Sequence, residues 1–122
     1  MAEPRMNELA RELLERSKAR KVGWEETREA NAYAVLFRDV ALRISRRRVF
    51  VIEGLVFDAG QERGDRTDYE LELTGERGRI IGSLAAEPGQ PMHEVLEEIF
   101  ELADQHIRDT GVNKALDYLK QV

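Results

Sequence analysis

The spacing of apolar residues changes twice along the chain, and each change predicts a different kind of element. From Pro4 to about Lys21 the apolar residues recur every three or four positions, as they do along one face of an amphipathic helix. Basic residues near the end of this segment suit the negative end of a helix dipole. Gly23 tolerates the left-handed conformation that terminates many helices, so we expect this helix to stop at Val22.

Between residues 33 and 84 apolar and polar residues alternate, which is the period of a β-strand. Five strands are expected, at 33–37, 40–45, 49–57, 69–74 and 79–84. The first two are separated by little more than Arg38 and Asp39, which predicts an antiparallel hairpin. A second short turn, at 75–78, is expected to join the last two strands.

The segment 49–57 differs from the other expected strands because it is apolar at nearly every position. This pattern favours a strand that is covered on both faces, either central in the sheet or at an interface, with a bulge or bend at Gly54. The segment 58–68 that follows is almost wholly polar and predicts a mobile loop.

Helical spacing returns after Pro91, a residue that suits a first helical turn. Gly111 is expected to end this second helix, and Asn113 is expected to cap a short third one. Leu116 and Leu119 would give the third helix its apolar contact with the rest of the protein.

The order of these elements predicts an α+β fold. It would consist of an N-terminal helix, an antiparallel meander of about five strands, and two C-terminal helices packed on one face of the sheet. The chain has 122 residues and no internal repeat, so we expect one domain spanning residues 1–122.

Composition narrows the possible functions. The chain has no cysteine, which excludes disulfides, thiolate zinc sites and thiol nucleophiles. Its apolar runs are far shorter than the roughly 20 residues of a membrane-spanning helix, and its first residues lack the apolar segment of a secretion signal. The sequence therefore predicts a cytoplasmic protein that does not enter the membrane.

One basic patch stands out in a chain whose formal net charge is −5. Its members are Arg43, Arg46, Arg47 and Arg48, which we expect near a hairpin turn. Several arginines close together can contact phosphate groups. Nucleic-acid or anion binding is therefore one hypothesis, although the negative net charge opposes it, and an ionic turn neutralised by nearby acids is the simpler interpretation.

The second expected helix carries an acidic face. The candidate residues for a surface that meets a basic partner are Glu94, Glu97, Glu98 and Glu101. A row of charges on a helix is also what a solvated face requires. Both interpretations remain open from the sequence.

The two histidines are the natural candidates for acid–base or metal chemistry. His93 and Glu97 are one helical turn apart and could share a proton or a cation. The Glu-x-x-His spacing of carboxylate-bridged metal centres is absent, however. His106 is expected at the edge of the apolar stripe as a half-buried packing residue. No catalytic residue, cofactor or metal is predicted, since phosphate-binding glycine loops and nucleophile motifs are also missing.

Four motifs give the chain a likeness to a known group of proteins that spans about residues 9 to 84. They are Trp24-Glu25-Glu26-Thr27, Tyr33 with alternating apolar residues, Arg43-Ile44-Ser45-Arg46, and Tyr69-Glu70-Leu71-Glu72-Leu73. In these motifs the chain resembles small uncharacterised bacterial α+β proteins that begin with a helix and continue as a β-meander. The resemblance implies this fold order and a bacterial cytoplasmic origin, with no known activity. Residues 49–66 look like an extra or lengthened hairpin relative to that pattern.

The absence of catalytic motifs and the two-sided apolar segment 49–57 together favour a non-catalytic function. Our leading hypothesis from the sequence is a protein-interaction module that binds a protein partner or associates with itself. The alternatives are the nucleic-acid binder that uses the arginine patch and, in third place, a metal-dependent or acid–base enzyme that uses His93 and Glu97.

Overall fold

The structure is a computed structural model that describes residues 4–60 and 66–122. Its elements in chain order are α1 (Pro4–Lys18), β1 (Glu25–Glu26), β2 (Ala32–Leu36), β3 (Ala41–Ile52), β4 (Leu55–Gly60), β5 (Arg66–Thr74), the 3₁₀ turn η1 (Glu76–Gly78), β6 (Ile80–Ala86) and α2 (His93–Lys120). The fold class predicted from the sequence is therefore confirmed as α+β. Residues 61–65, in the middle of the loop expected at 58–68, lie outside the described residues.

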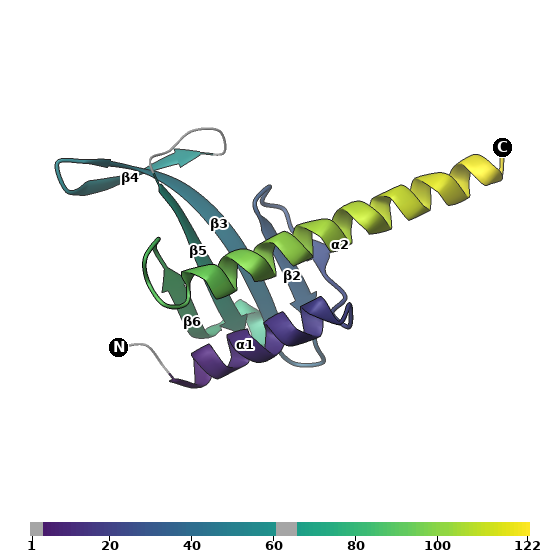
Figure 1. Ribbon diagram of the computed structural model, residues 1–122. Helices are drawn as coiled ribbons and strands as arrows, with labels where there is room; N and C mark the ends of the chain where they lie inside the picture. The colour runs from purple at the N-terminus through teal and green to yellow at the C-terminus, as the bar shows by residue number, and fades with distance from the viewer. Residues whose placement is uncertain (1–3, 61–65) are drawn as a thin grey trace.

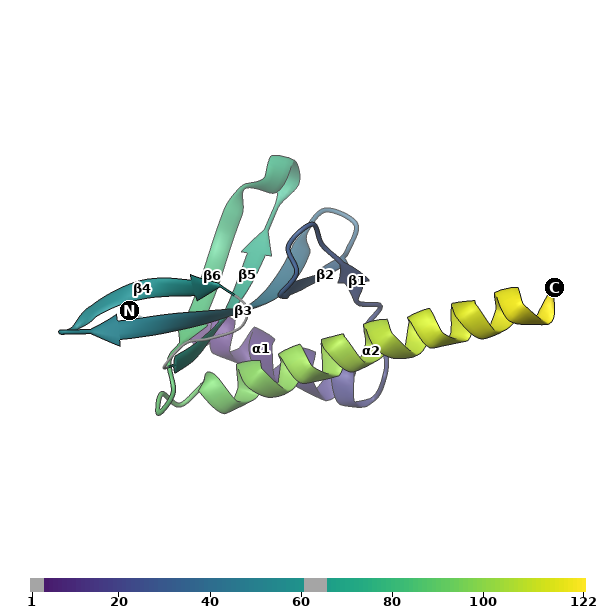
Figure 2. The ribbon, with the colours of Figure 1, turned by 90° about the horizontal axis from the view of Figure 1, so that it is seen from above.

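The sheet is antiparallel, and both helices pack on one of its faces (Figures 1 and 2). Its strand order is β1-β2-β3-β5-β6, and β4 pairs with β3 outside this path. The hairpin expected around Arg38 and Asp39 is present, with Leu36 opposite Ala41. The structure thus has six strands among its described residues, where the sequence predicted about five.

The hydrophobic core lies between the sheet and the two helices. Alternate residues of the central strands point to this side, and Ile44 and Leu71, which are cross-strand partners, are both fully buried. Leu96 and Ile99 of α2 and Ala10 of α1 close the core from the other side and are also fully buried. The apolar stripes of the two helices therefore contact the sheet face that the alternating pattern predicted.

Helix α1 ends earlier than the sequence suggested. Arg20, and not Gly23, adopts the left-handed conformation after the helix, with φ of 59°. The backbone N–H groups of Arg20 and Lys21 donate to the carbonyls of Ser17 and Arg16, at 3.1 and 2.9 Å. These are the paired hydrogen bonds of a Schellman motif, which satisfy the last carbonyls of the helix and favour its end at Lys18.

The segment 49–57 is not the single two-sided strand that its apolar pattern predicted. It contains the end of β3, a two-residue turn at Glu53 and Gly54, and the start of β4. Both turn residues have positive φ, 52° and 81°, the combination that a type I′ hairpin turn requires. Ile52, Leu55 and Phe57 therefore face solvent on a projecting ribbon, whereas Val49 at its base is fully buried.

The prediction of a separate third helix is also wrong. Helix α2 continues without interruption from His93 to Lys120, and Gly111 is an internal residue of it. A glycine inside a helix costs only about 1 kcal/mol relative to alanine, so the good helix formers around it can carry the helix through. The described residues thus contain two α-helices. The end of α2 extends beyond the sheet, as Figure 1 shows, and residues 111–120 are all exposed.

Candidate functional site

The expected basic patch lies within strand β3 and not near a hairpin turn, so the location predicted for it is wrong. Its members are Arg43, Arg46, Arg47 and Arg48. Successive side chains of a strand point to opposite faces of the sheet. Arg43 and Arg47 therefore project from the open face, whereas Arg46 and Arg48 project towards α2. The sheet divides the four charges between its two faces, and this arrangement does not favour a shared phosphate-binding surface.

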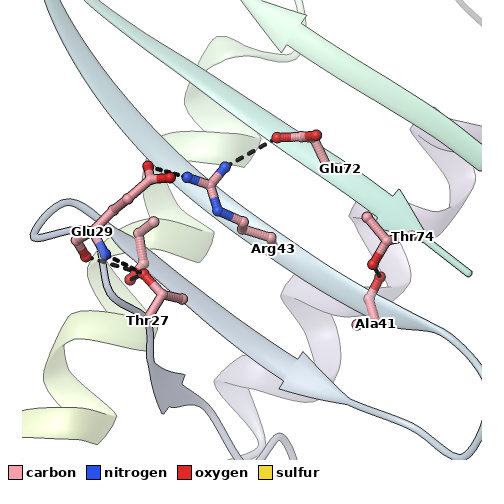
Figure 3. A network of polar contacts seen from close by, with 7 residues as sticks. Thr27, Glu29, Ala41, Arg43, Glu72 and Thr74 are labelled. Atoms are coloured by element: carbon pink, nitrogen blue, oxygen red, sulfur yellow. Dashed lines mark hydrogen bonds and ion pairs between the residues drawn. The ribbon is translucent and has the colours of Figure 1, made fainter. Parts of the chain in front are cut away.

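On the open face, Arg43 is held between two carboxylates (Figure 3). Its guanidinium donates to Glu72 Oε1 on the neighbouring strand at 3.0 Å and also to Glu29. The Thr27 hydroxyl accepts from the backbone N–H of Glu29 at 3.1 Å and donates to the Ala32 carbonyl at 3.0 Å, which orders the loop that carries Glu29. The charge of Arg43 is therefore neutralised within the chain.

A third carboxylate shares this face. Glu70 lies two residues before Glu72 on β5 and is only partly exposed. Its burial and the neighbouring charge of Glu72 raise the pKa of Glu70 above its ordinary value, while Arg43 and Arg47 oppose that shift. The open face of the sheet is thus a network of opposite charges.

On the helix face, Arg46 is a packing residue. Its guanidinium carbon lies 4.7 Å from the centre of the Phe100 ring, and its Nη2 donates to Asn31 Oδ1 at 3.1 Å. The stacking holds the cation against α2, and the hydrogen bond ties it to the residue that precedes β2. The Nε atoms of Arg46 and Arg48 are buried and have no hydrogen-bond partner among the described residues. The contact with Phe100 makes Arg46 the arginine of this patch that joins the sheet to α2.

Two tyrosines complete this layer between the sheet and α2. The Tyr33 hydroxyl donates to Asp104 Oδ1, and burial, together with this hydrogen bond, raises the pKa of Tyr33 to about 12. Burial and the charge of Glu97 also raise the pKa of Tyr69. The Phe100 ring lies 5.3 Å from the Tyr33 ring and 5.8 Å from the Tyr69 ring. These contacts are those of a structural aromatic cluster.

The acidic residues of α2 do not share one environment. Glu98 forms an ion pair with Lys18 of α1 at 3.4 Å, which links the two helices. Glu97 and Glu101 act electrostatically on Tyr69, although Glu101 is exposed. Glu94 is exposed in the first turn of the helix. Part of the predicted partner surface is thus engaged within the chain.

His93 is also engaged by the fold. Its Nε2 lies 2.9 Å from the backbone carbonyl of Thr67, and its ring packs edge-on against Tyr69 at 5.2 Å. No group of three or more His, Asp or Glu side chains that could hold a metal occurs among residues 4–60 and 66–122. The contacts of His93 attach the start of α2 to β5.

His106 lies at one wall of a cleft between the end of α1 and α2. It is half-buried, as the sequence predicted. The cleft measures about 410 Å³ and is also lined by Trp24, Leu102 and Asp109. Trp24 itself is buried, and its Nε1 donates to Ser17 Oγ at 3.4 Å. Trp24 therefore closes the core beneath the cleft.

Exposed large apolar side chains are concentrated on the β3–β4 hairpin. We call residues 50–57 the hairpin arm, and Figure 2 shows that it projects past the start of α2. Cross-strand pairing places four large apolar side chains on one face of it: Phe50, Ile52, Leu55 and Phe57. The exposed fractions are 57% for Ile52, 63% for Leu55 and 48% for Phe57.

The opposite face of the arm is apolar too, with Val56 45% exposed. In the described ranges, β4 pairs with β3 and with no further strand. The arm is therefore a ribbon with apolar side chains on both faces. The sequence did contain a signal for its turn, because Glu53 and Gly54 interrupt two apolar runs at hairpin spacing.

Comparison of the chain with protein families, with curated proteins and with solved structures found no match. Among the described residues, neither helix is long and apolar enough to cross a bilayer. The candidate site is therefore assigned from its own geometry. Among the described residues we select the hairpin arm, because several large apolar side chains are exposed together on it.

Proposed function

We propose that this protein is a non-catalytic interaction module and that the hairpin arm is its contact surface. The observation that carries the proposal is the exposure of Ile52, Leu55 and Phe57 on one face of a projecting ribbon. Contiguous exposed apolar residues on a folded protein typically mark a surface that another molecule covers.

The energetics of hairpins support the same conclusion. A two-stranded hairpin without further packing is marginally stable in water. Covering a large apolar side chain contributes about 1.5–3 kcal/mol, so a partner that covers the arm would stabilise its conformation as well as bind to it. An exposed strand edge also invites pairing with another chain. Self-association is therefore the form of the proposal that is tested first.

Sedimentation velocity over a concentration series tests the proposal. The wild-type chain is expected to form a species larger than the monomer as concentration rises. A Leu55→Ser/Phe57→Ser double variant is expected to remain monomeric, because it replaces two of the four apolar side chains on that face of the arm with polar ones. Ile80→Ser is the matched control, since Ile80 is 59% exposed on a different strand, and it should associate as the wild type does.

Two results would contradict the proposal. One is a wild-type chain that stays monomeric at every concentration. The other is a double variant that associates as strongly as the wild type. Circular dichroism of the double variant shows whether its fold is retained, and the solvent position of both side chains predicts that it is.

A further inference from the structure

A second apolar surface lies at the end of α2. We call residues 111–120 the α2 tail, and every residue in it is exposed. Three apolar residues at helical spacing form a stripe along it: Val112 at 58%, Leu116 at 48% and Leu119 at 69% exposure. Short helices without packing partners are marginal in water. Like the arm, the tail is a secondary-structure element that lacks cover within the described part of the chain.

The tail stripe does not continue the buried stripe of α2. Val112 follows the fully buried Ala103 by nine positions, or about 2.5 turns at 3.6 residues per turn, and so lies on the opposite side of the helix. Leu119 follows Ala103 by about 4.4 turns and points to nearly the same side as Val112. The apolar side of the helix is therefore reversed near Gly111. The tail stripe faces away from the protein's own core.

The arm and the tail project from opposite ends of the body. Figure 1 shows the hairpin at the upper left and the end of α2 at the upper right, and Figure 2 again places them at opposite ends. A two-fold rotation that inverts a second copy above the first would bring each arm beside the tail of the other copy. Such an interface uses the same surface on both partners and closes on itself.

We propose that the hairpin arm of one copy packs against the α2 tail of a second copy, and the reverse, in a two-fold dimer. This inference rests on the proposed function and names the partner of the arm. The apolar face with Leu55 and Phe57 would meet the stripe formed by Val112, Leu116 and Leu119. Each element would receive from the other copy the packing that the described residues of its own chain do not provide.

The size of the two surfaces fits this arrangement. Three arm residues and three tail residues contribute: Ile52, Leu55, Phe57, Val112, Leu116 and Leu119. With about 150 Å² for a fully accessible large side chain, their exposed fractions amount to roughly 500 Å² per chain. The dimer would bury about 1,000 Å² in total from these residues, which reaches the lower limit for a biological interface.

Charge and symmetry favour the arm–tail pairing over its rivals. Glu53 is the one charged residue between positions 49 and 57, whereas the tail carries Lys114 and Lys120 against Asp117. The arm is thus slightly acidic and the tail slightly basic. An arm–arm dimer would leave both tails uncovered, and a tail–tail dimer would leave both arms uncovered. The reciprocal pairing covers all four surfaces.

Disulfide trapping tests the pairing directly, because the chain has no cysteine of its own. Leu55→Cys is placed in one chain and Leu116→Cys in a second chain with a tag of different size, and the full-length proteins are mixed under mild oxidation. The mixed disulfide is expected to form at least tenfold faster than either homodimeric one. Asp117→Cys is the matched control, since Asp117 is exposed on the same tail about 100° away from Leu116, and it should trap poorly with Leu55→Cys.

The possible outcomes separate this inference from the proposed function. Preferential trapping of Leu55→Cys with itself would keep the arm as a contact surface and overturn the arm–tail pairing. Preferential trapping of Leu116→Cys with itself, or equal trapping by Asp117→Cys, would overturn the pairing too. If sedimentation shows only monomers, both proposals fail.

Discussion

The two halves of helix α2 share one backbone conformation and have opposite surroundings. Leu96 in the first half is fully buried between the sheet and α1, whereas Leu116 in the tail is 48% exposed. The hydrogen bonds of a helix are local, so they continue wherever the sequence permits. Burial depends instead on what lies opposite. Continuity of an element is therefore no evidence that its apolar residues belong to the core of the same chain.

Strand β3 teaches the same lesson in a sheet. Its first half places Leu42 and Ile44 in the core between β2 and β5. Its second half runs past the helices and ends in the hairpin arm, where Ile52 is exposed. The hairpin arm and the α2 tail thus keep the secondary structure of the elements that they extend, and they differ from them only in that their apolar side chains are exposed.

The sharpest way to break this comparison uses two leucines of α2. Leu96→Ala should lower the free energy of unfolding by about 2–5 kcal/mol, because it removes buried methyl groups and leaves a cavity. Leu116→Ala should change it by less than about 0.5 kcal/mol in a dilute, monomeric sample. Urea denaturation measures both values. Equal losses would mean that the tail packs within its own chain.

The arginines of β3 offer a comparison across the two faces of the sheet. Arg46→Ala removes a guanidinium that stacks on Phe100 and binds Asn31, and it should cost on the order of 2 kcal/mol. Arg47→Ala, at an exposed position beside it, should stay within about 0.5 kcal/mol. Thermal denaturation of both variants checks whether only the arginine on the helix face contributes strongly to stability. A large loss of stability for Arg47→Ala would contradict this expectation.

Gly111 decides between the interrupted helix expected from the sequence and the continuous helix of the structure. If Gly111 is an internal helical residue, Gly111→Ala stabilises the helix locally by about 1 kcal/mol. Far-ultraviolet circular dichroism should then show more helix. A left-handed glycine at a helix end would give the opposite result, since alanine is strained in that conformation.

Tyr33 tests the layer between sheet and helix through its pH dependence. Tyr33→Phe loses the hydrogen bond to Asp104 and should cost about 1 kcal/mol at neutral pH. The pKa of Tyr33 is raised from 10.0 to about 12 in the fold, so its stabilising effect is complete below pH 10 and is lost as pH rises through about 12. Denaturation of both proteins across this range should show the difference shrinking. A difference that persists above pH 12 would contradict the assignment.

The smallest expected effect concerns the two glutamates of the open face. The pKa of Glu70 is raised above 4.5 in the fold by burial and by Glu72, so the stability gained from protonated Glu70 is complete below pH 4.5 and is lost as pH rises through its folded value. Glu70→Gln should therefore stabilise the protein at neutral pH, by less than about 1 kcal/mol, with no gain below pH 4.5. Glu72→Gln, which removes a partner of Arg43, should destabilise it slightly. Melting temperatures of both variants at neutral pH and below pH 4.5 show whether Glu70→Gln stabilises the protein while Glu72→Gln destabilises it.

Much of the body could be predicted from local patterns. The three-and-four spacing around Leu13 gave the first helix, and the alternation around Leu71 gave a strand with one buried face. The half-buried position of His106 also followed from its place on the helical stripe. These predictions succeeded because period and burial are coupled wherever an element lies against a core.

The candidate site could be predicted only in part. The composition of segment 49–57 predicted a strand that is central or at an interface. The contact role stays a prediction, and the shape was wrong, because an apolar run has the same pattern whether neighbours cover it or it folds back at Glu53 and Gly54. The distribution of the four arginines over the two faces of the sheet could not be predicted, because it depends on the position of β3 in the sheet. Leu116 and Leu119 were expected to pack against the rest of the protein, but both side chains are exposed among the described residues.

The sequence by itself determined the order of helical and strand regions and which of their faces are apolar, since these properties depend on neighbouring residues and on the period of the backbone. Only the tertiary structure decided which apolar faces are covered, because cover depends on residues distant in the chain. It buries Ile44 and Leu96 and leaves Leu55 and Leu116 at the surface.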